Sequence, residues 1–197
     1  MRDLGGVRDG QTPLDPGETA QLVPSWVVTR ADLDRAELAA ILDVIVALSR
    51  GRRAPGDVLA ERFLRDLHGR MFGAVWKWAG TYRRSDKNIG IPWPLVPQQV
   101  GQLLDDARYW AEHVVYSPDE LALRFHHGLV AIHPFPDGNG RHARLAGDLL
   151  AEALGCERFS WGRGLAADPD RARSAYIAAL RAADGGELAD LLAFARR

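Results

Sequence analysis

The sequence predicts an all-α fold, a helical bundle that carries one short β-hairpin. Apolar residues recur at helical spacing in seven segments, most of which are bounded by capping residues or glycines. Only the stretch 81–95 has the pattern of short strands around a turn. With 197 residues and 47% hydrophobic content, the chain can bury one sizeable core, so a single domain is expected after an N-terminal arm.

The N-terminal part of the chain changes character near Thr29. Residues 1–28 are rich in glycine and proline, which predicts an extended arm that lies on the domain. Thr29 followed by Asp32 resembles a capping arrangement and predicts a helix over 31–49. After a polar linker, Asp57 is expected to cap a second helix, whose apolar face contains Leu59, Phe63, Leu64, Leu67 and Met71.

The remaining elements follow the same periodicity. Gly155 and the pair Gly185-Gly186 stand where helices are expected to stop. Tyr82 and Ile91 flank an Asp-Lys-Asn-Ile-Gly turn, which predicts the hairpin. The five further helices are expected over 97–113, 118–132, 140–154, 169–183 and 186–195.

Charge and cysteine content exclude several classes of protein. A formal net charge of −1 gives no general attraction to nucleic acid or to anionic membranes, so any affinity for phosphate has to come from a local site. The single cysteine, Cys156, excludes an intramolecular disulfide. The N-terminus lacks a signal peptide's apolar segment, and the most apolar stretch, 38–48, is too short to cross a bilayer. We therefore expect a soluble cytoplasmic protein without nucleic-acid or membrane partners.

The stretch 131–144, Ala-Ile-His-Pro-Phe-Pro-Asp-Gly-Asn-Gly-Arg-His-Ala-Arg, concentrates the reactive side chains. Its glycine-rich loop leads into an amphipathic helix, so free backbone N–H groups and the helix dipole are expected to bind an anion. Arg141 and Arg144 share a helix face and can bind neighbouring phosphates. The predicted polyphosphate-binding residues are Gly138, Asn139, Gly140, Arg141 and Arg144.

Asp137 and His133, which precede this loop, are candidates for metal binding and proton transfer. Asp137 would be repelled by a phosphate unless a cation lay between them, which predicts a bridging Mg²⁺. His133 can accept a proton near neutral pH and is the predicted general base. Together these groups predict transfer from a nucleotide to a hydroxyl. Taken singly, each has a simpler role, because His133 could cap the helix ending at Ile132 and Asp137 could cap the next one.

From His133 to Arg144 the sequence resembles the complete signature of Fic (Fido) domains, His-Pro-Phe-x-[Asp/Glu]-Gly-Asn-Gly-Arg-x-x-Arg. The segment Trp78-Ala-Gly-Thr-Tyr-Arg is similar to the start of the Fic flap hairpin, and the helix order is similar over about residues 55–183. Segments near both ends resemble the bacterial subgroup called mobile mystery protein B. The resemblance implies one Fic-type helical domain over 29–197, with its core at about 55–183.

The resemblance also implies a reaction, the transfer of AMP from Mg²⁺-bound ATP to a Ser, Thr or Tyr hydroxyl of a target protein. His133 would be the general base, Asp137 the Mg²⁺ ligand, Arg141 a β-phosphate partner and Arg144 the γ-phosphate partner. The flap would bind an extended segment of the target by strand addition, although it could equally be a surface hairpin packed by Trp93. The flap residues assigned to target docking are Tyr82, Arg83, Lys87, Asn88, Ile89 and Gly90.

Regulation and two rival functions stay open. Many Fic domains have an inhibitory helix, [Ser/Thr]-x-x-x-Glu-[Gly/Asn], whose Glu pairs with the last arginine of the signature, but no Ser or Thr of this chain is followed four positions on by Glu. A separate antitoxin could supply that Glu, which would make the chain the toxin of a toxin–antitoxin pair, or the N-terminal arm could block the site. The rivals are a nucleotide-binding regulatory module without turnover and a Doc-like phosphotransferase.

Histidines and one tyrosine outside these roles are expected to be structural. Adjacent histidines on a helix point roughly 100° apart, so His126, His127, His133 and His142 do not predict a zinc site. Tyr176 is a candidate neighbour of an adenine ring, but it lies on an apolar helix stripe that is more typical of a core.

Overall fold

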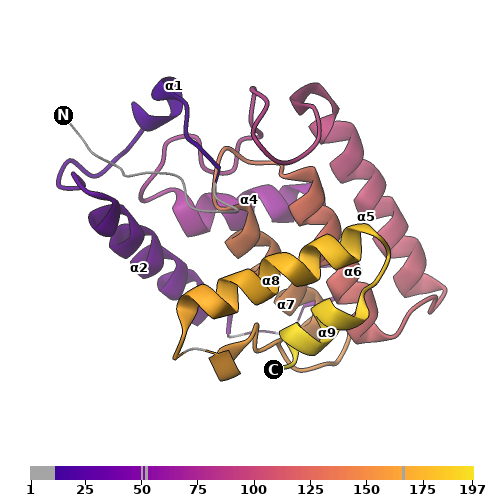
Figure 1. The fold of residues 1–197 in the computed structure, drawn as a ribbon. Coiled ribbons are helices and arrows are strands. Elements are labelled where there is room, and N and C mark those ends of the chain that lie inside the picture. The colour runs from indigo at the N-terminus through magenta and orange to yellow at the C-terminus, as the bar shows by residue number, and fades with distance from the viewer. Residues whose placement is uncertain (1–11, 50, 52, 166) are drawn as a thin grey trace.

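A computed structural model describes residues 12–49, 51, 53–165 and 167–197, and the predicted all-α class is confirmed (Figure 1). Within these ranges the β-structure is limited to isolated bridge residues, with Leu22 paired to Trp76 and Thr29 as a further bridge residue. The helices are α1 Pro16–Thr19, α2 Arg30–Leu48, α3 Pro55–Val58, α4 Glu61–Phe72, α5 Val96–Glu112, α6 Pro118–Ile132, α7 Asn139–Ala153, α8 Pro169–Asp184 and α9 Ala189–Ala195, with 3₁₀ turns η1 Trp93–Leu95 and η2 Arg163–Leu165.

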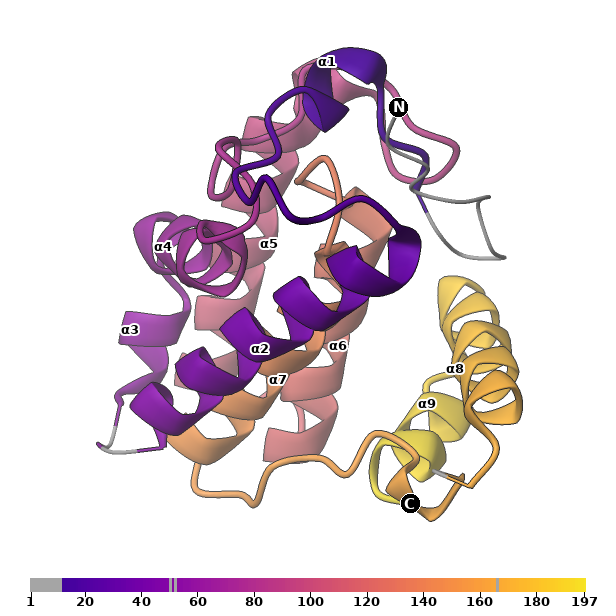
Figure 2. The same ribbon diagram turned by 90° about the vertical axis from the view of Figure 1, so that its left-hand side faces the viewer.

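Helices α6 and α7 form the centre of the fold. They are joined by the loop 133–138 and pack along each other, with α5 against α6 and with α3 and α4 against α7. Figure 2 shows α8 and α9 as a separate pair beside this group, on the side away from α4. Buried leucines and alanines line the inner face of α7, so the helix is anchored on several sides. Its first turn is therefore held rigidly.

Most helix boundaries agree with the sequence predictions. Thr29 and Asp32 cap α2 reciprocally, because the Thr29 N–H donates to Asp32 Oδ2 at 2.9 Å and the Asp32 N–H donates to Thr29 Oγ1 at 3.2 Å. Helix α6 spans the predicted residues 118–132. It begins at a serine cap, Ser117, and ends because His133 adopts a left-handed conformation before Pro134.

The second predicted helix is wrong in one respect, because it is divided into α3 and α4. Asp57 caps α3, where its Oδ2 accepts a hydrogen bond from the Ala54 N–H at 2.9 Å, and it does not cap α4. The break follows from a distant contact. The Leu59 carbonyl accepts hydrogen bonds from Arg108 Nε at 3.0 Å and Nη2 at 2.6 Å, so it lies outside the helical hydrogen-bond pattern.

The predicted strand pairing of the flap is not formed in residues 81–92, which we call the flap loop. Arg83 explains the difference. Its buried guanidinium donates to the carbonyls of Ser85 at 2.9 Å, of Ile91 and of His133 at 2.7 Å. One side chain thus binds carbonyls on both arms of the loop and joins the loop to the end of α6, so a strand ladder is not needed to satisfy these groups.

The described part of the N-terminal arm, residues 12–28, contains the single helical turn α1 and further turns at 20–21 and 25–26. It lies on the domain because the Val23 N–H donates to the Val75 carbonyl at 2.8 Å and the Lys77 N–H donates to the Gln21 carbonyl at 3.1 Å. Residues 1–11 of the predicted arm lie outside the described residues. In the described parts of the chain, no helix has both the length and the apolar character to cross a membrane.

Candidate functional site

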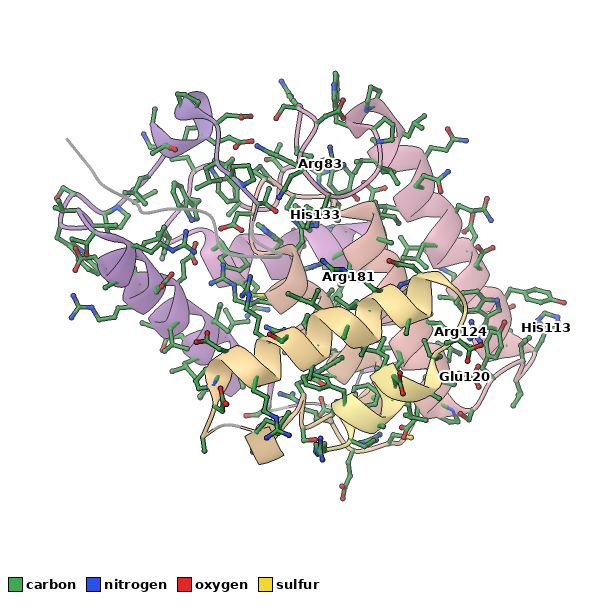
Figure 3. All side chains as sticks on the ribbon, viewed as in Figure 1. Arg83, His113, Glu120, Arg124, His133 and Arg181 are labelled. Carbon is green, nitrogen blue, oxygen red and sulfur yellow. The ribbon has the colours of Figure 1, made fainter. Side chains whose placement is uncertain are left out.

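A cavity of about 990 Å³ lies where the arm, the flap loop, the α6–α7 loop and α8 meet. Its volume is at the upper end of the range typical of small-molecule sites. Figure 3 shows Arg83 and His133 next to each other, with Arg181 of α8 on the other side of His133. The structure brings the predicted phosphate and base residues to this one cavity, whose lining includes His133, Asp137, Gly138, Asn139, Gly140, Arg141 and Arg144.

His133 occupies the end of α6 with backbone angles φ 56° and ψ 60°, a left-handed conformation that is uncommon for a residue other than glycine. The side chain is 5% exposed. Burial, and then the positive charges of Arg83 and Lys87, lower the pKa of His133 to about 4, although the nearby Val130 carbonyl raises it. The imidazole is therefore neutral at pH 7 and able to accept a proton.

The two ring nitrogens of His133 have different surroundings. Nε2 lies 2.7 Å from the hydroxyl oxygen of Thr12, which belongs to the N-terminal arm. Nδ1 is buried and has no hydrogen-bond partner of ordinary geometry among the described groups, even though the Val130 carbonyl is close enough to affect the pKa. The nitrogen that faces the cavity is thus the one that already contacts a hydroxyl.

The first turn of α7 is built to face an anion. Gly138 caps this helix with φ +78°, and a Cβ atom there would lie 2.5 Å from the Phe72 ring, so only glycine fits. The N–H groups that follow have no acceptor within the helix, and residues 138–141 line the cavity. Their donors and the helix dipole would favour an anion at this turn, which we call the anion site.

The Asn139 side chain is buried and closes the loop before α7. Its Oδ1 accepts a hydrogen bond from the Phe135 N–H at 2.9 Å, and its Nδ2 donates to the Phe135 carbonyl at 2.8 Å. Asn139 therefore shapes the anion site, to which it contributes its backbone.

The two arginines of the signature have different partners. Arg141 Nη1 donates to Glu37 Oε2 at 2.6 Å, and its Nη2 lies 3.8 Å from Asp137 Oδ2. Burial opposes the charge of Arg141, but Glu37 and Asp137 raise its pKa, so the guanidinium stays charged. The Arg144 guanidinium lies 5.1 Å from the centre of the Tyr176 ring, and the structure shows no ion pair for it within the described ranges.

His68 is a functional-site residue that the sequence analysis missed. It accepts a hydrogen bond at Nδ1 from the Gly80 N–H at 3.0 Å, so its Nε2 carries the proton and donates to the Asp137 carbonyl at 3.0 Å. Its ring stacks on Phe135 at a centroid distance of 3.8 Å. Burial, and then the nearby His142, hold the pKa of His68 well below its usual value. The imidazole therefore stays neutral and keeps its hydrogen bonds to Gly80 and Asp137.

The flap residues divide into three groups. Arg83 is buried below the loop, and Tyr82 is half-buried with its hydroxyl oxygen enclosed. The Lys87 side chain is 2% exposed because the N-terminal arm covers it. Three residues line the cavity beside His133, namely Asn88, Ile89 and Gly90.

Gly90 makes the closest approach of the flap loop to the base. A Cβ atom at this position would lie 2.6 Å from His133 Cβ and 3.1 Å from Arg83 Nη2, and φ is +97°. Glycine is therefore required both by the backbone conformation and by the lack of space. The flap loop therefore packs directly against one side of His133.

Tyr176, His126 and His142 are mainly structural. The Tyr176 hydroxyl lies 3.1 Å from His126 Nε2, and both side chains are buried, although the tyrosine also borders the cavity. His142 Nε2 lies 2.9 Å from the Leu64 carbonyl and joins α7 to α4. The described residues contain no group of three or more His, Cys, Asp or Glu side chains arranged to hold a metal ion.

Comparison with known proteins identifies the family. Residues 58–151 match the model of the Fic/DOC family. The protein adenylyltransferase fic-1 of Caenorhabditis elegans is 32% identical over 127 residues, which are 62% of this chain and 24% of that protein. Protein adenylyltransferase Fic of Aedes aegypti is 31% identical over 103 residues, or 50% and 21%. The chain thus spans about a quarter of the length of these relatives.

Solved structures share the fold. A fragment of Fic-1 from C. elegans has a TM-score of 0.66 at 23% identity and covers 91% of this chain and 51% of the fragment. BepC of Bartonella tribocorum, solved with bound AMPPNP, has a TM-score of 0.69 at 16% identity, with 92% and 97% covered. The residues that match the family model, 58–151, include the loop and the first turn of α7 that carry the signature. This part of the chain is therefore a Fic domain of the Fic/DOC family.

Proposed function

We propose that the protein is an adenylyltransferase that transfers AMP from ATP to a Ser, Thr or Tyr hydroxyl of a protein. The observation that carries this proposal is the neutral His133 imidazole, whose Nε2 borders the same cavity as the anion site of α7. The names of the relatives, protein adenylyltransferases, support the same reaction. The nucleotide analogue bound to BepC supports a nucleotide in a fold of this kind.

In the proposed reaction the acceptor hydroxyl approaches His133 Nε2, which takes its proton as the oxygen attacks the α-phosphorus of ATP. The bond from the α-phosphorus to the bridging oxygen breaks, and pyrophosphate leaves. The N–H groups at the start of α7, together with Arg141 and Arg144, bind the phosphates and stabilise the developing negative charge. The main contributions of the protein are thus positioning and charge stabilisation.

Asp137 fits the role of a Mg²⁺ ligand. Its carboxylate is 17% exposed on the cavity wall, beside the anion site. Mg²⁺ is commonly bound through one or two carboxylates together with substrate phosphates and water, so one carboxylate at this position is sufficient. When bound, the ion would neutralise phosphate charge and make the acid compatible with an anionic ligand. The His68 hydrogen bond fixes the backbone that presents Asp137.

The resemblance favours AMP transfer over transfer of the γ-phosphate, because Doc-like phosphotransferases alter the Gly-Asn-Gly-Arg portion that is complete in this sequence. Gly138 of this portion lies against Phe72, which holds the shape of the turn. The target would contact Asn88, Ile89 and Gly90 beside His133, since these three residues line the cavity and Arg83 is buried.

A toxin–antitoxin role, with a separate protein that supplies a Glu to Arg144, stays a prediction of the sequence. The structure offers one relevant observation, because the N-terminal arm already contacts His133 through Thr12. Control by the arm therefore has direct structural support.

Mass spectrometry of a host lysate tests the proposal. The lysate is incubated with Mg²⁺, ATP and either the wild-type chain or His133→Ala, and peptides that carry an adenylyl group are compared. We expect adenylylated Ser, Thr or Tyr residues only with the wild-type chain. Phosphorylated peptides in their place, or tight ATP binding without any modified protein, would refute AMP transfer.

A further inference from the structure

The arm places a hydroxyl where the proposed reaction requires one. Thr12 Oγ1 lies 2.7 Å from His133 Nε2, and Thr12 belongs to the lining of the cavity that holds the anion site. A general base has to lie within about 3.2 Å of the oxygen whose proton it removes. The Thr12 hydroxyl satisfies this condition without any movement of the chain.

Lys87 of the flap loop holds the arm in this position. Its Nζ lies 2.6 Å from Glu18 Oε2 and 3.0 Å from Asp15 Oδ2, and it donates to the Pro13 carbonyl at 3.3 Å. The Lys87 and Glu18 side chains are 2% and 14% exposed, so water screens this ion pair less than a pair at an open surface, whereas Asp15 is 53% exposed. The contacts begin at the residue after Thr12, so they fix the register of the arm against the flap loop.

Two further contacts hold the segment that follows Thr12. Ser85 Oγ donates to Asp15 Oδ2 at 2.7 Å, and the hydrogen bonds from Ser85 and Lys87 lower the pKa of Asp15, which keeps it charged. Trp78 Nε1 donates to the Glu18 carbonyl at 3.3 Å. The arm is therefore seated along the flap loop, on the side of the cavity where we propose that target proteins bind.

Other hydroxyl groups nearby are engaged elsewhere. Thr19 Oγ1 donates to the Asp15 carbonyl at 3.1 Å, and Ser85 Oγ donates to the Asp15 carboxylate. Neither has a hydrogen bond to His133, whose hydroxyl contact within the described chain is Thr12. Thr12 is thus distinguished from Thr19 and Ser85 by its contact with His133.

We propose that Thr12 is an acceptor in cis, a self-modification site to which the protein transfers AMP, and this inference rests on the proposed adenylyltransferase function. Thr12 Oγ1 forms a bond to the α-phosphorus of ATP, while the bond to the bridging oxygen breaks and pyrophosphate leaves. The hydroxyl proton passes to His133 Nε2. The product is a phosphodiester between Thr12 and AMP, so atoms and charge balance with ATP as the one co-substrate.

The modification would have a consequence for the site. A Thr12 that carries AMP no longer has a hydroxyl proton to donate to His133, and its added phosphate bears a negative charge. Self-modification would therefore remove the hydrogen bond that joins the arm to His133.

The test uses the purified full chain, incubated with Mg²⁺ and α-labelled ATP, followed by peptide mapping. We expect one adenylyl group per chain, located on Thr12. Thr12→Val removes the hydroxyl at nearly constant volume, and Thr19→Val is the matched control on the same arm. His133→Ala should lower the labelling of Thr12 by roughly 10²- to 10⁴-fold, the usual contribution of a general base.

A mixing experiment tests whether the transfer is intramolecular. A His133→Ala chain, which keeps Thr12, is mixed with an active Thr12→Val chain. We expect the inactive chain to stay unlabelled, and the labelling rate per wild-type chain to be independent of protein concentration. Labelling of the inactive chain on Thr12 would overturn transfer in cis.

The outcomes separate this inference from the proposed function. Adenylylation of lysate proteins or of other residues, with Thr12 unmodified, overturns the inference and leaves the proposed function intact. The same conclusion follows if Thr12→Val is labelled as strongly as Thr19→Val. If no protein receives AMP, and lysate proteins incubated with the Thr12→Val chain also stay unmodified, both the inference about Thr12 and the proposed function are overturned. Melting temperatures within error of wild type show that each arm variant is folded.

Discussion

Glu37 and Arg141 form an ion pair that joins α2 to α7, with Glu37 Oε2 and Arg141 Nη1 separated by 2.6 Å. The Glu37 side chain is 1% exposed, and its Oε1 accepts a hydrogen bond from Trp76 Nε1 at 2.7 Å. One end of the guanidinium is thus held by α2, while Nη2 lies toward Asp137 and the cavity. Helix α2 therefore positions an arginine of the phosphate site.

Glu37→Gln should weaken both the fold and the binding of ATP. The substitution leaves Arg141 without its counter-charge at a largely buried position, which costs about 2 kcal/mol in free energy of unfolding. We also expect a higher KM for ATP, because Arg141 loses its fixed orientation. Urea unfolding and initial rates measure the two effects, and Asp43→Asn on the exposed face of α2 is the control. An unchanged KM would exclude a positioning role for Glu37.

Asn139→Ala should disrupt the loop before α7. The N–H and carbonyl of Phe135 would lose their partners at a buried position, at a cost of roughly 2 kcal/mol. Asn139→Asp keeps the acceptor and loses the donor, so its effect on unfolding should be intermediate. Thermal unfolding of both variants checks this order. A fully stable Asn139→Ala with weak ATP binding would instead mean that the amide binds phosphate.

Gly90→Ala should impair transfer by moving the flap loop away from His133. The added methyl group would lie 2.6 Å from His133 Cβ, a distance that ordinary contacts do not reach, and φ +97° is unfavourable for alanine. We expect AMP transfer to fall by about tenfold or more, since small displacements of reacting groups are costly.

The matched control is Gly101→Ala on α5, where a Cβ atom would have no neighbour within 4 Å. Alanine in that helix should stabilise the protein by up to about 1 kcal/mol and leave transfer unchanged. Equal activity of the two variants would show that the contact between Gly90 and His133 is unimportant.

The pH dependence of transfer should reflect the low pKa of His133. Only the neutral imidazole accepts a proton, so activity is lost as the pH falls through the pKa, which is about 4. Between pH 8 and pH 6 we expect kcat/KM to be nearly constant. A histidine with the ordinary pKa of about 6.5 would lose roughly three quarters of its neutral form by pH 6. Such a loss would show that burial, Arg83 and Lys87 do not depress the pKa.

Local signals in the sequence were sufficient for most helices and for the core of the site. Helix α6 has a serine cap and a proline at its start, and a histidine followed by a proline at its end, so its limits depend on neighbouring residues. The phosphate and base residues lie within twelve consecutive positions, where a loop followed by a helix brings them together. Contiguous features of this kind are readable without knowledge of the tertiary structure.

The remaining parts of the site depend on contacts between distant segments. The break between α3 and α4 depends on Arg108, and the missing strand pairing of the flap loop depends on the burial of Arg83. Thr12 reaches His133 across 121 positions of sequence, and no local pattern predicts this contact. The position of Glu37 is visible in the sequence pattern, because it lies four residues after Leu33 on the buried face of α2. A carboxylate on that face requires a buried partner.

The most direct test of AMP transfer compares ATP labelled at the α-phosphate with ATP labelled at the γ-phosphate. The wild-type chain and His133→Ala are incubated in parallel with Mg²⁺ and lysate protein, and the label bound to protein is measured. We predict that protein becomes labelled only with α-labelled ATP, and only in the presence of the wild-type chain. Protein-bound label from γ-labelled ATP, or α-label that survives His133→Ala, would contradict the proposed transfer with His133 as its base.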